Sequence, residues 1–206
     1  MAETILYLFP ESFNSNLFIE EISNDYLLKT EFLNKRRQIY FDTFDWRLYN
    51  HNLILFKEQK SYYLESLNSN QIITNYKSVN RSEFRFWWEL SESDLKSKIK
   101  PVLDIRALLR LVDLDRDTVT LRILNTDKKT VLKVNVETIQ TIKNKKPVSL
   151  NNLIRLQPIR GYQDDYNNFI QYLARKNWQK FTDHFFNYIM SIIGEVPALS
   201  NAELEC

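Results

Sequence analysis

The sequence predicts an α+β protein whose body is an antiparallel β-sheet. Three observations carry this expectation: short segments in which apolar and polar residues alternate, polar turns between these segments, and helical periodicity confined to the two ends of the chain. The expected order is one helix before most of the sheet and two helices after it.

The first helix is expected over residues 15–33. Leu17, Phe18 and Ile22 recur at spacings near 3.6 residues, and Ser15 is a suitable N-cap. A short apolar strand, residues 3–9, precedes it and ends at Pro10.

The sheet is expected from segments rich in alternating and β-branched residues. These are residues 61–67, 71–79, 81–90, 102–112, 117–124, 130–139 and 153–159. A polar hairpin loop, residues 125–129, joins two of them. A helical turn over residues 91–101 interrupts the series and is expected to stop before Pro101.

Two amphipathic helices are expected near the C-terminus. The first presents apolar residues at 166, 169, 170, 173 and 174, and the second spans residues 182–193 before Gly194. We therefore expect a main domain over residues 1–178 and a C-terminal helix and tail over residues 179–206.

Composition excludes several kinds of site. The only cysteine is Cys206, so no internal disulfide or cysteine metal cage can form. His51 and His184 are the only histidines and neither has a partner at ligand spacing, which disfavours the usual zinc sites. The only glycines are Gly161 and Gly194, so glycine-rich phosphate loops of the GxGxxG or GxxxxGK[ST] type cannot be written from this chain.

Charge and hydropathy bound the partners and the location. A net charge of +2 gives no overall attraction to nucleic acid, and no segment reaches the roughly 18 apolar residues of a membrane span. The N-terminus lacks the basic region and apolar core of a secretory signal. We expect a cytoplasmic protein that binds neither a membrane nor nucleic acid.

Basic residues recur on the polar faces of the expected strands, as with Arg122, Lys133 and Arg155. In an open sheet they would be ordinary solvent-facing charges. In a closed barrel of seven or eight strands they would line a lumen suited to phosphate, because a guanidinium group donates two parallel hydrogen bonds to such an anion.

The stretch Tyr40–Leu55, YFDTFDWRLYNHNLIL, resembles the Y-[YF]-D-T-x-D-x-x-L-x-x-x-x-x-x-L signature of the CYTH domain, the fold of the triphosphate tunnel metalloenzymes. Its positions are occupied in order by Tyr40, Phe41, Asp42, Thr43, Asp45, Leu48 and Leu53 or Leu55. Asp42 and Asp45 are expected to brace a turn by accepting hydrogen bonds from backbone N–H groups rather than to bind metal.

The later segments follow in an order similar to that of the family. An R-x-E strand at 81–83 precedes a helical insert, a P-V-x-x-x-R-x-x-x-R run at 101–110, a V-x-V-[DE] segment at 134–137, and a last strand ending in a basic residue and glycine at 160–161. Together these segments extend the resemblance over most of the chain.

The resemblance implies an antiparallel eight-stranded β-barrel, or tunnel, with flanking helices. It implies a triphosphate-bearing substrate and, if the protein is active, hydrolysis or transfer that depends on Mg²⁺ or Mn²⁺. The implied phosphate-binding residues are Lys57, Arg81, Arg85, Arg106, Arg110, Arg122, Lys133 and Arg160, and the implied metal ligands are Glu83 and Glu137. It also implies a helical, polyphosphate-associated partner domain or a second copy, docked on residues 182–193.

The sequence departs from the family where metal ligands are expected. The family's first strand reads E-x-E-x-K, but here Ile5 and Tyr7 follow Glu3 at the other two positions. The last strand carries Gln157 and no carboxylate. Glu83 and Glu137 alone make a poor octahedral site, so no residue is assigned as catalytic.

Three functions stay open. The first is binding of a phosphate-rich anion, such as triphosphate, polyphosphate or a nucleotide, in an arginine-lined tunnel with little or no catalysis. The second is a Mg²⁺- or Mn²⁺-dependent triphosphate hydrolase with an altered metal site. The third is a protein-interaction scaffold whose barrel is filled by side chains.

Overall fold

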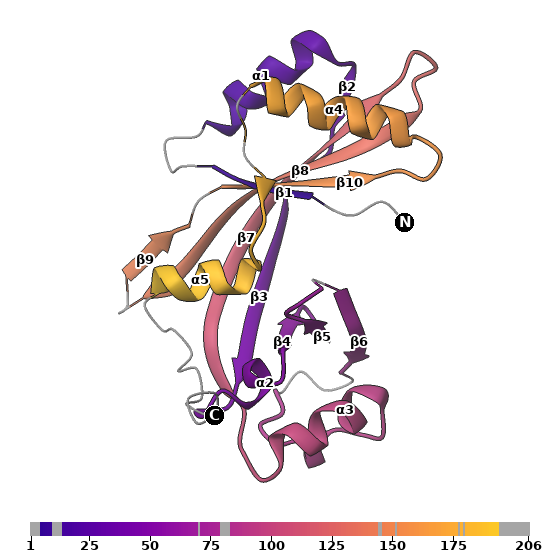
Figure 1. Ribbon diagram of the computed structural model, residues 1–206. Coiled ribbons are helices and arrows are strands. Elements are labelled where there is room, and N and C mark those ends of the chain that lie inside the picture. The colour runs from indigo at the N-terminus through magenta and orange to yellow at the C-terminus, as the bar shows by residue number, and fades with distance from the viewer. Residues whose placement is uncertain are drawn as a thin grey trace, which may run out of the picture. The chain divides into compact units, whose positions relative to one another are not determined.

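The computed structural model describes residues 5–9, 14–69, 71–78, 83–143, 146–150, 152–176, 178 and 180–193. The fold is α+β, with a large antiparallel sheet (Figure 1). The chain forms two compact units. Unit 1 comprises Met1–Arg36, Asp115–Gln140 and Pro147–Thr182, and unit 2 comprises Arg37–Leu114, Thr141–Lys146 and Asp183–Cys206. The long strands β7 (Leu109–Leu124) and β8 (Thr130–Lys143) contribute residues to both units.

The sheet of unit 1 has the strand order β11-β1-β10-β8-β7, with β2 also paired to β7 and β9 to β8. The remaining strands are β1 (Ile5–Leu8), β2 (Leu28–Thr30), β9 (Lys146–Ser149), β10 (Leu153–Pro158) and β11 (Lys180–Phe181). Since the pairs of β1, β2 and β10 with their neighbours are antiparallel, residues directly opposite each other point to the same face of the sheet.

One face of the unit 1 sheet is apolar and is covered by two helices, α1 (Ser15–Asp25) and α4 (Gln163–Arg175), which lie over the same side in Figure 1. The residues that pack together there are Tyr7, Val134, Val136, Ile154 and Leu156 of the sheet, Phe18 and Ile22 of α1, and Phe169 and Leu173 of α4. The helices bury their apolar stripes on this face, and the opposite face of the same strands is therefore left to polar residues.

Local sequence sets the ends of these two helices. The side chain of Asn14 accepts hydrogen bonds from the backbone N–H groups of Asn16 and Leu17, at 2.9 Å and 3.2 Å, and so caps α1. Gly161 has a φ of +91°, a value that side chains rarely tolerate, in the turn that leads from β10 into α4.

Unit 2 has the strand order β7-β3-β4-β5-β6. Its strands are β3 (Asn34–Asp42), β4 (Leu53–Glu58), β5 (Ser61–Ser66) and β6 (Gln71–Lys77), and its helices are α2 (Arg47–Asn50), the 3₁₀ helix η1 (Trp87–Glu89), α3 (Asp94–Leu103) and α5 (Phe185–Ile193). The apolar stripe of α3 joins a core with Phe41, Leu55 and Leu64. Phe186 of α5 packs against the ring of Tyr40, with 5.2 Å between ring centroids.

The helix expected over residues 15–33 is shorter than predicted. It ends at Asp25, and Tyr26 already has an extended backbone. Leu28–Thr30 forms β2 because these residues find partners on β7, a pairing distant in sequence that local periodicity does not reveal.

Two expectations between residues 81 and 112 are wrong. The described part of 81–90 holds η1 and no strand, and the helix expected to stop before Pro101 continues to Leu103. Leu95, Ile99 and Leu103, four residues apart, are all buried, and this packing outweighs the backbone hydrogen bond that Pro101 removes. The next strand, β7, consequently begins at Leu109 rather than at residue 102.

Among the residues that the structure describes, no helix has the length and apolar character needed to cross a membrane.

Candidate functional site

The second face of the unit 1 sheet, which we call the polar face, gathers most of the polar side chains of this unit's strands. Arg155 lies opposite Asn135, Gln157 opposite Lys133, and Lys29 opposite Arg122, so each pair shares a face. Thr120 donates a hydrogen bond to Asn135 at 2.7 Å, which places the even-numbered residues of β7 on that face as well. The polar face comprises Lys29, Arg116, Thr118, Thr120, Arg122, Lys133, Asn135, Glu137, Arg155 and Gln157.

A buried carboxylate, that of Glu137, lies on the polar face between two arginines. Arg116 donates to its Oε2 and Arg155 Nε donates to its Oε1 at 3.3 Å. Burial acts to raise the pKa of Glu137, but the charges and hydrogen bonds of the two arginines outweigh it, and the pKa is lowered from its ordinary value. Glu137 is therefore ionised at neutral pH and already has two cationic partners.

The other basic residues of the polar face are less fully paired. Arg122 forms an ion pair with Glu31, which follows β2. Lys29 and the half-buried Lys133 make no ion pair within the part of the chain that the structure describes. Five basic side chains, those of Lys29, Arg116, Arg122, Lys133 and Arg155, thus face two acidic ones, those of Glu31 and Glu137. The polar face carries a net positive charge.

The first strand contributes apolar residues to the polar face. Leu6 lies opposite Arg155, and Leu8 opposite Leu153, whereas Ile5 and Tyr7 lie on the face that the helices cover. The residues of β1 on the polar face are therefore Leu6 and Leu8, and Ile5 and Tyr7 belong to the apolar core instead. Glu3, which the sequence offered as the remaining acid, lies outside the described residues.

In unit 2 a second cluster surrounds Glu83. Arg110 donates to both of its carboxylate oxygens, at 2.7 Å and 2.8 Å, and Lys57 Nζ lies 3.4 Å from Oε1. Arg37 pairs with Asp113, which also lies 3.8 Å from Arg110. The bidentate geometry of the Arg110 pair is the strong form of this interaction.

The remaining predicted phosphate ligands are dispersed. Arg106 lies 3.2 Å from Asp45 and 5.1 Å from the ring of Phe44, in unit 2. Arg85, in unit 2, and Arg160, in unit 1, are both exposed. Arg81 lies outside the described residues. The structure brings Arg122 and Lys133 to one face in unit 1, and Lys57 and Arg110 to one carboxylate in unit 2.

Within the part of the chain that the structure describes, the carboxylates do not offer Mg²⁺ or Mn²⁺ the cluster of oxygen ligands that these ions need. No group of three histidine, cysteine, aspartate or glutamate side chains gathers as a metal site within the described ranges. Glu83 and Glu137 belong to different units, and each is held by two cationic side chains.

Sequence reasoning left seven residues of the polar face out of the predicted site: Arg116, Lys29, Thr118, Thr120, Asn135, Arg155 and Gln157. The strand expected from residue 117 began one residue too late to include Arg116, although Arg116 shares its parity with Thr118, Thr120 and Arg122. Lys29 was not predicted as a residue of the sheet because the helix expected over residues 15–33 included it, whereas it belongs to β2. If the expected strand had been extended to residue 116, the alternation of side chains along it would have identified Arg116, but it would not have identified Lys29.

The aspartates of the Tyr40–Leu55 signature have different roles. Asp42 is buried and accepts hydrogen bonds from the backbone N–H groups of Thr43, Leu48 and Tyr49, at 2.7, 2.9 and 2.9 Å. This confirms that Asp42 braces the turn. Burial raises the pKa of Asp42, and its three N–H donors oppose that effect. Asp45 pairs instead with the guanidinium groups of Arg47 and Arg106, each at 3.2 Å.

No protein-family model and no curated protein sequence matches the chain. Solved structures do match it. HpAC1 from Hippeastrum, described as a candidate adenylyl cyclase with a dominant triphosphatase activity, is 12% identical with a TM-score of 0.56, over 96% of this chain and 98% of that one. A candidate adenylate cyclase from Bacillus halodurans is 12% identical with a TM-score of 0.53, over 88% and 92% of the two chains.

At such low identity these likenesses concern the fold rather than the chemistry. They agree with the signature at Tyr40–Leu55 and with the antiparallel sheet and its helices. The chain has a CYTH-like fold, of the type found in triphosphatases and cyclases.

Proposed function

We propose that the chain binds a phosphate-rich anion, such as triphosphate, polyphosphate or a nucleotide, on the polar face of unit 1, with little or no turnover. The observation that carries the proposal is the excess of basic over acidic side chains on that face. Most of these charges are partly shielded from solvent, which strengthens their attraction to an anion.

The cations are spread over neighbouring strands. Arg155 lies on β10, Lys133 on β8 and Arg122 on β7, and these three strands are adjacent. Since strands are about 4.8 Å apart, the three positions span roughly 10 Å across the sheet. An anion with several linked phosphates can contact all three positions at once, with each phosphate beside its own cation.

Neutral donors accompany these charges. Asn135 and Gln157 lie beside Arg155 and Lys133 in the pairing of β8 with β10. Their amide groups can donate hydrogen bonds to phosphate oxygens. Guanidinium groups on the same face supply charge-assisted bonds, which are stronger than neutral ones.

We propose low turnover because the carboxylate of Glu137 is already occupied by hydrogen bonds from arginines. Glu137 is the polar face's own carboxylate, and both of its oxygens accept hydrogen bonds from arginines. A divalent ion would have to displace these arginines before it could bind there. Binding of the anion by the basic residues alone needs no such rearrangement.

Calorimetry with inorganic triphosphate in the presence of EDTA tests the proposal. Lys133→Gln and Arg122→Gln should each weaken binding by roughly ten-fold, the size expected for one charge-assisted hydrogen bond. Lys35→Gln is the matched control, because Lys35 belongs to unit 1 but pairs with Asp117 and is largely exposed. Absence of heat with triphosphate, long-chain polyphosphate and ATP alike would refute the proposal.

The second candidate function is metal-dependent hydrolysis of a triphosphate. The structural likeness to HpAC1, described as having triphosphatase activity, favours it. Its test is release of phosphate from triphosphate with Mg²⁺ or Mn²⁺. Release that depends on Glu83 or Glu137 would support hydrolysis over binding alone, and an inert preparation would count against it.

A further inference from the structure

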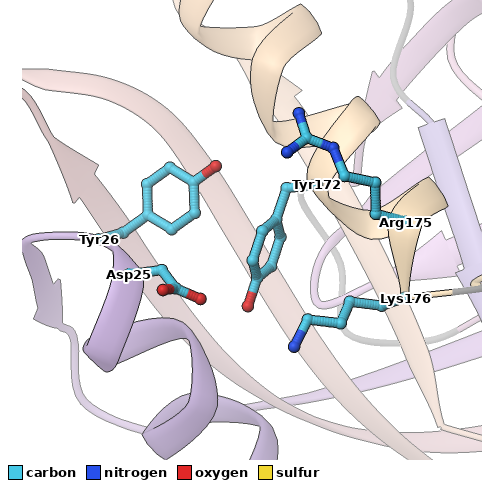
Figure 2. Close-up of a pocket in the computed structure, with 5 residues that line it drawn as sticks. All are labelled: Asp25, Tyr26, Tyr172, Arg175 and Lys176. Carbon is cyan, nitrogen blue, oxygen red and sulfur yellow. The ribbon is translucent and has the colours of Figure 1, made fainter.

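A cleft of about 460 Å³ lies in unit 1 at the C-terminal ends of α1 and α4. It is lined by Asp25, Tyr26, Tyr172, Arg175 and Lys176, which Figure 2 shows around a common space. Because α1 and α4 cover the apolar face of the sheet, the cleft is on the other side of the sheet from the polar face. A ligand bound in this cleft would therefore be independent of anion binding on the polar face.

Two opposite charges in the cleft lack an ion-pair partner. Neither Asp25 nor Arg175 makes a salt bridge within the described part of the chain, and both side chains are exposed. Lys176, by contrast, is paired with Glu21 at 2.5 Å. In Figure 2 the Arg175 guanidinium and the Asp25 carboxylate lie on opposite sides of the space that the tyrosines border.

Two tyrosine rings form the walls. The rings of Tyr26 and Tyr172 meet edge to face with 5.3 Å between centroids, and Lys176 Nζ lies 5.6 Å from the Tyr172 centroid. Burial, and then a side-chain hydrogen bond with Asp25, raise the pKa of Tyr172 to about 12, so its phenol keeps its proton. The walls are therefore aromatic and uncharged.

The ends of the helices add to the polarity of the cleft. Asp25 is the last residue of α1 and Arg175 the last of α4, so both helix dipoles place a partial negative charge at the cleft, which favours a cation beside Asp25 and leaves the attraction of an anion to the full charge of Arg175. The Arg175 guanidinium offers a planar pair of donors that suits a carboxylate. A ligand in the cleft therefore meets a cation-binding end, an anion-binding end and aromatic surface between them.

We propose that this cleft binds a small zwitterion of the α-amino-acid class that carries an aromatic side chain. Its carboxylate would accept hydrogen bonds from Arg175 and its ammonium group would lie beside Asp25. Its ring would pack against Tyr26 and Tyr172, where edge-to-face contacts with aromatic groups are favourable.

An amide-proton NMR titration of the full chain with L-phenylalanine tests this proposal. The expected dissociation constant is on the order of 1 mM, given the small size of the ligand. Phenethylamine, which lacks the carboxylate, and 3-phenylpropionate, which lacks the ammonium group, should each bind about ten-fold more weakly. Equal binding of the three compounds, or no saturable shifts near the cleft with any of them, would overturn the proposal.

Two variants assign the ends of the ligand. Arg175→Gln should weaken binding of L-phenylalanine about ten-fold and leave binding of phenethylamine unchanged, while Asp25→Asn should weaken L-phenylalanine similarly and leave 3-phenylpropionate unchanged. Both side chains are exposed, so neither change disturbs the core. Lys35→Gln is the control, since Lys35 is an exposed cation of unit 1 that does not line the cleft. Equal losses for all ligands with either variant would contradict the assigned orientation.

Discussion

Arg155 on β10 donates a hydrogen bond from Nε to Oε1 of Glu137 on β8, at 3.3 Å. The two residues are diagonal neighbours, because Leu153 lies directly opposite Glu137 in the strand pairing. With Arg116 on the other carboxylate oxygen, Glu137 keeps its charge although it is almost fully buried. A carboxylate whose charge is already balanced in this way contributes to the stability of unit 1 and leaves the surrounding excess of cations intact.

Glu137→Gln should destabilise the protein. The change removes a negative charge between two arginines, and Arg116 is nearly as buried as Glu137. We expect a loss of about 3 kcal/mol in the free energy of unfolding, as for other broken buried pairs. Urea denaturation measures it. The matched control is Glu31→Gln, because the Glu31–Arg122 pair lies in the same unit but is partly exposed, and it should cost less than about 1 kcal/mol.

The same carboxylate predicts how stability depends on acid. The pKa of Glu137 is lower in the folded state than its unfolded value of about 4.3. The stabilisation is therefore fully present above about pH 4.3 and is lost as the pH falls through the lower folded value. Urea midpoints measured below about pH 4.3 should fall more steeply for the native chain than for Glu137→Gln. Parallel curves for the two proteins would show that Glu137 does not carry this acid sensitivity.

The two aspartates of the Tyr40–Leu55 stretch should contribute differently to stability, because Asp42 braces a buried turn and Asp45 forms partly exposed ion pairs. Asp42→Asn replaces one of the carboxylate oxygens that accept three backbone N–H groups in a buried site, and should cost about 2 kcal/mol. Asp45→Asn removes pairs that are partly exposed and should cost less than about 1 kcal/mol. Thermal unfolding of the two variants makes the comparison, and a larger loss for Asp45→Asn would contradict these roles.

Much of the fold could be predicted from local pattern. Alternation in residues 117–124 and 130–139 placed two strands, and the loop between them is confirmed by hydrogen bonds that close residues 125–129. The signature at Tyr40–Leu55 predicted the CYTH-like fold that the solved structures support. These features could be predicted because side-chain period and turn chemistry act over a few residues.

What the sequence left hidden depends on pairing between distant segments. Three-residue β2 exists because it pairs with β7, and only that pairing brings Lys29 to the polar face. The register of β1 decides that Leu6 rather than Tyr7 faces Arg155. The two arginines that hold Glu137 come from different strands, so its state cannot be read from its own segment. A shift of one residue in any of these pairings would reverse the face on which each side chain lies.

Removing the charge of Glu83 tests whether the unit 2 cluster of Glu83, Arg110 and Lys57 takes part in anion binding, in addition to the polar face of unit 1, or in hydrolysis. In unit 2 its carboxylate occupies both Arg110 and Lys57, which the sequence predicts as phosphate ligands. If these residues contribute to anion binding, Glu83→Gln releases them and triphosphate should bind several-fold more tightly, with or without EDTA, because one competing charge is gone. If Glu83 instead holds a catalytic metal, phosphate release is abolished and binding does not improve. Glu92→Gln is the control, since Glu92 lies in the same unit, is exposed and pairs with Lys96. Weaker triphosphate binding in a variant that still folds would contradict the predicted contribution of Lys57 and Arg110.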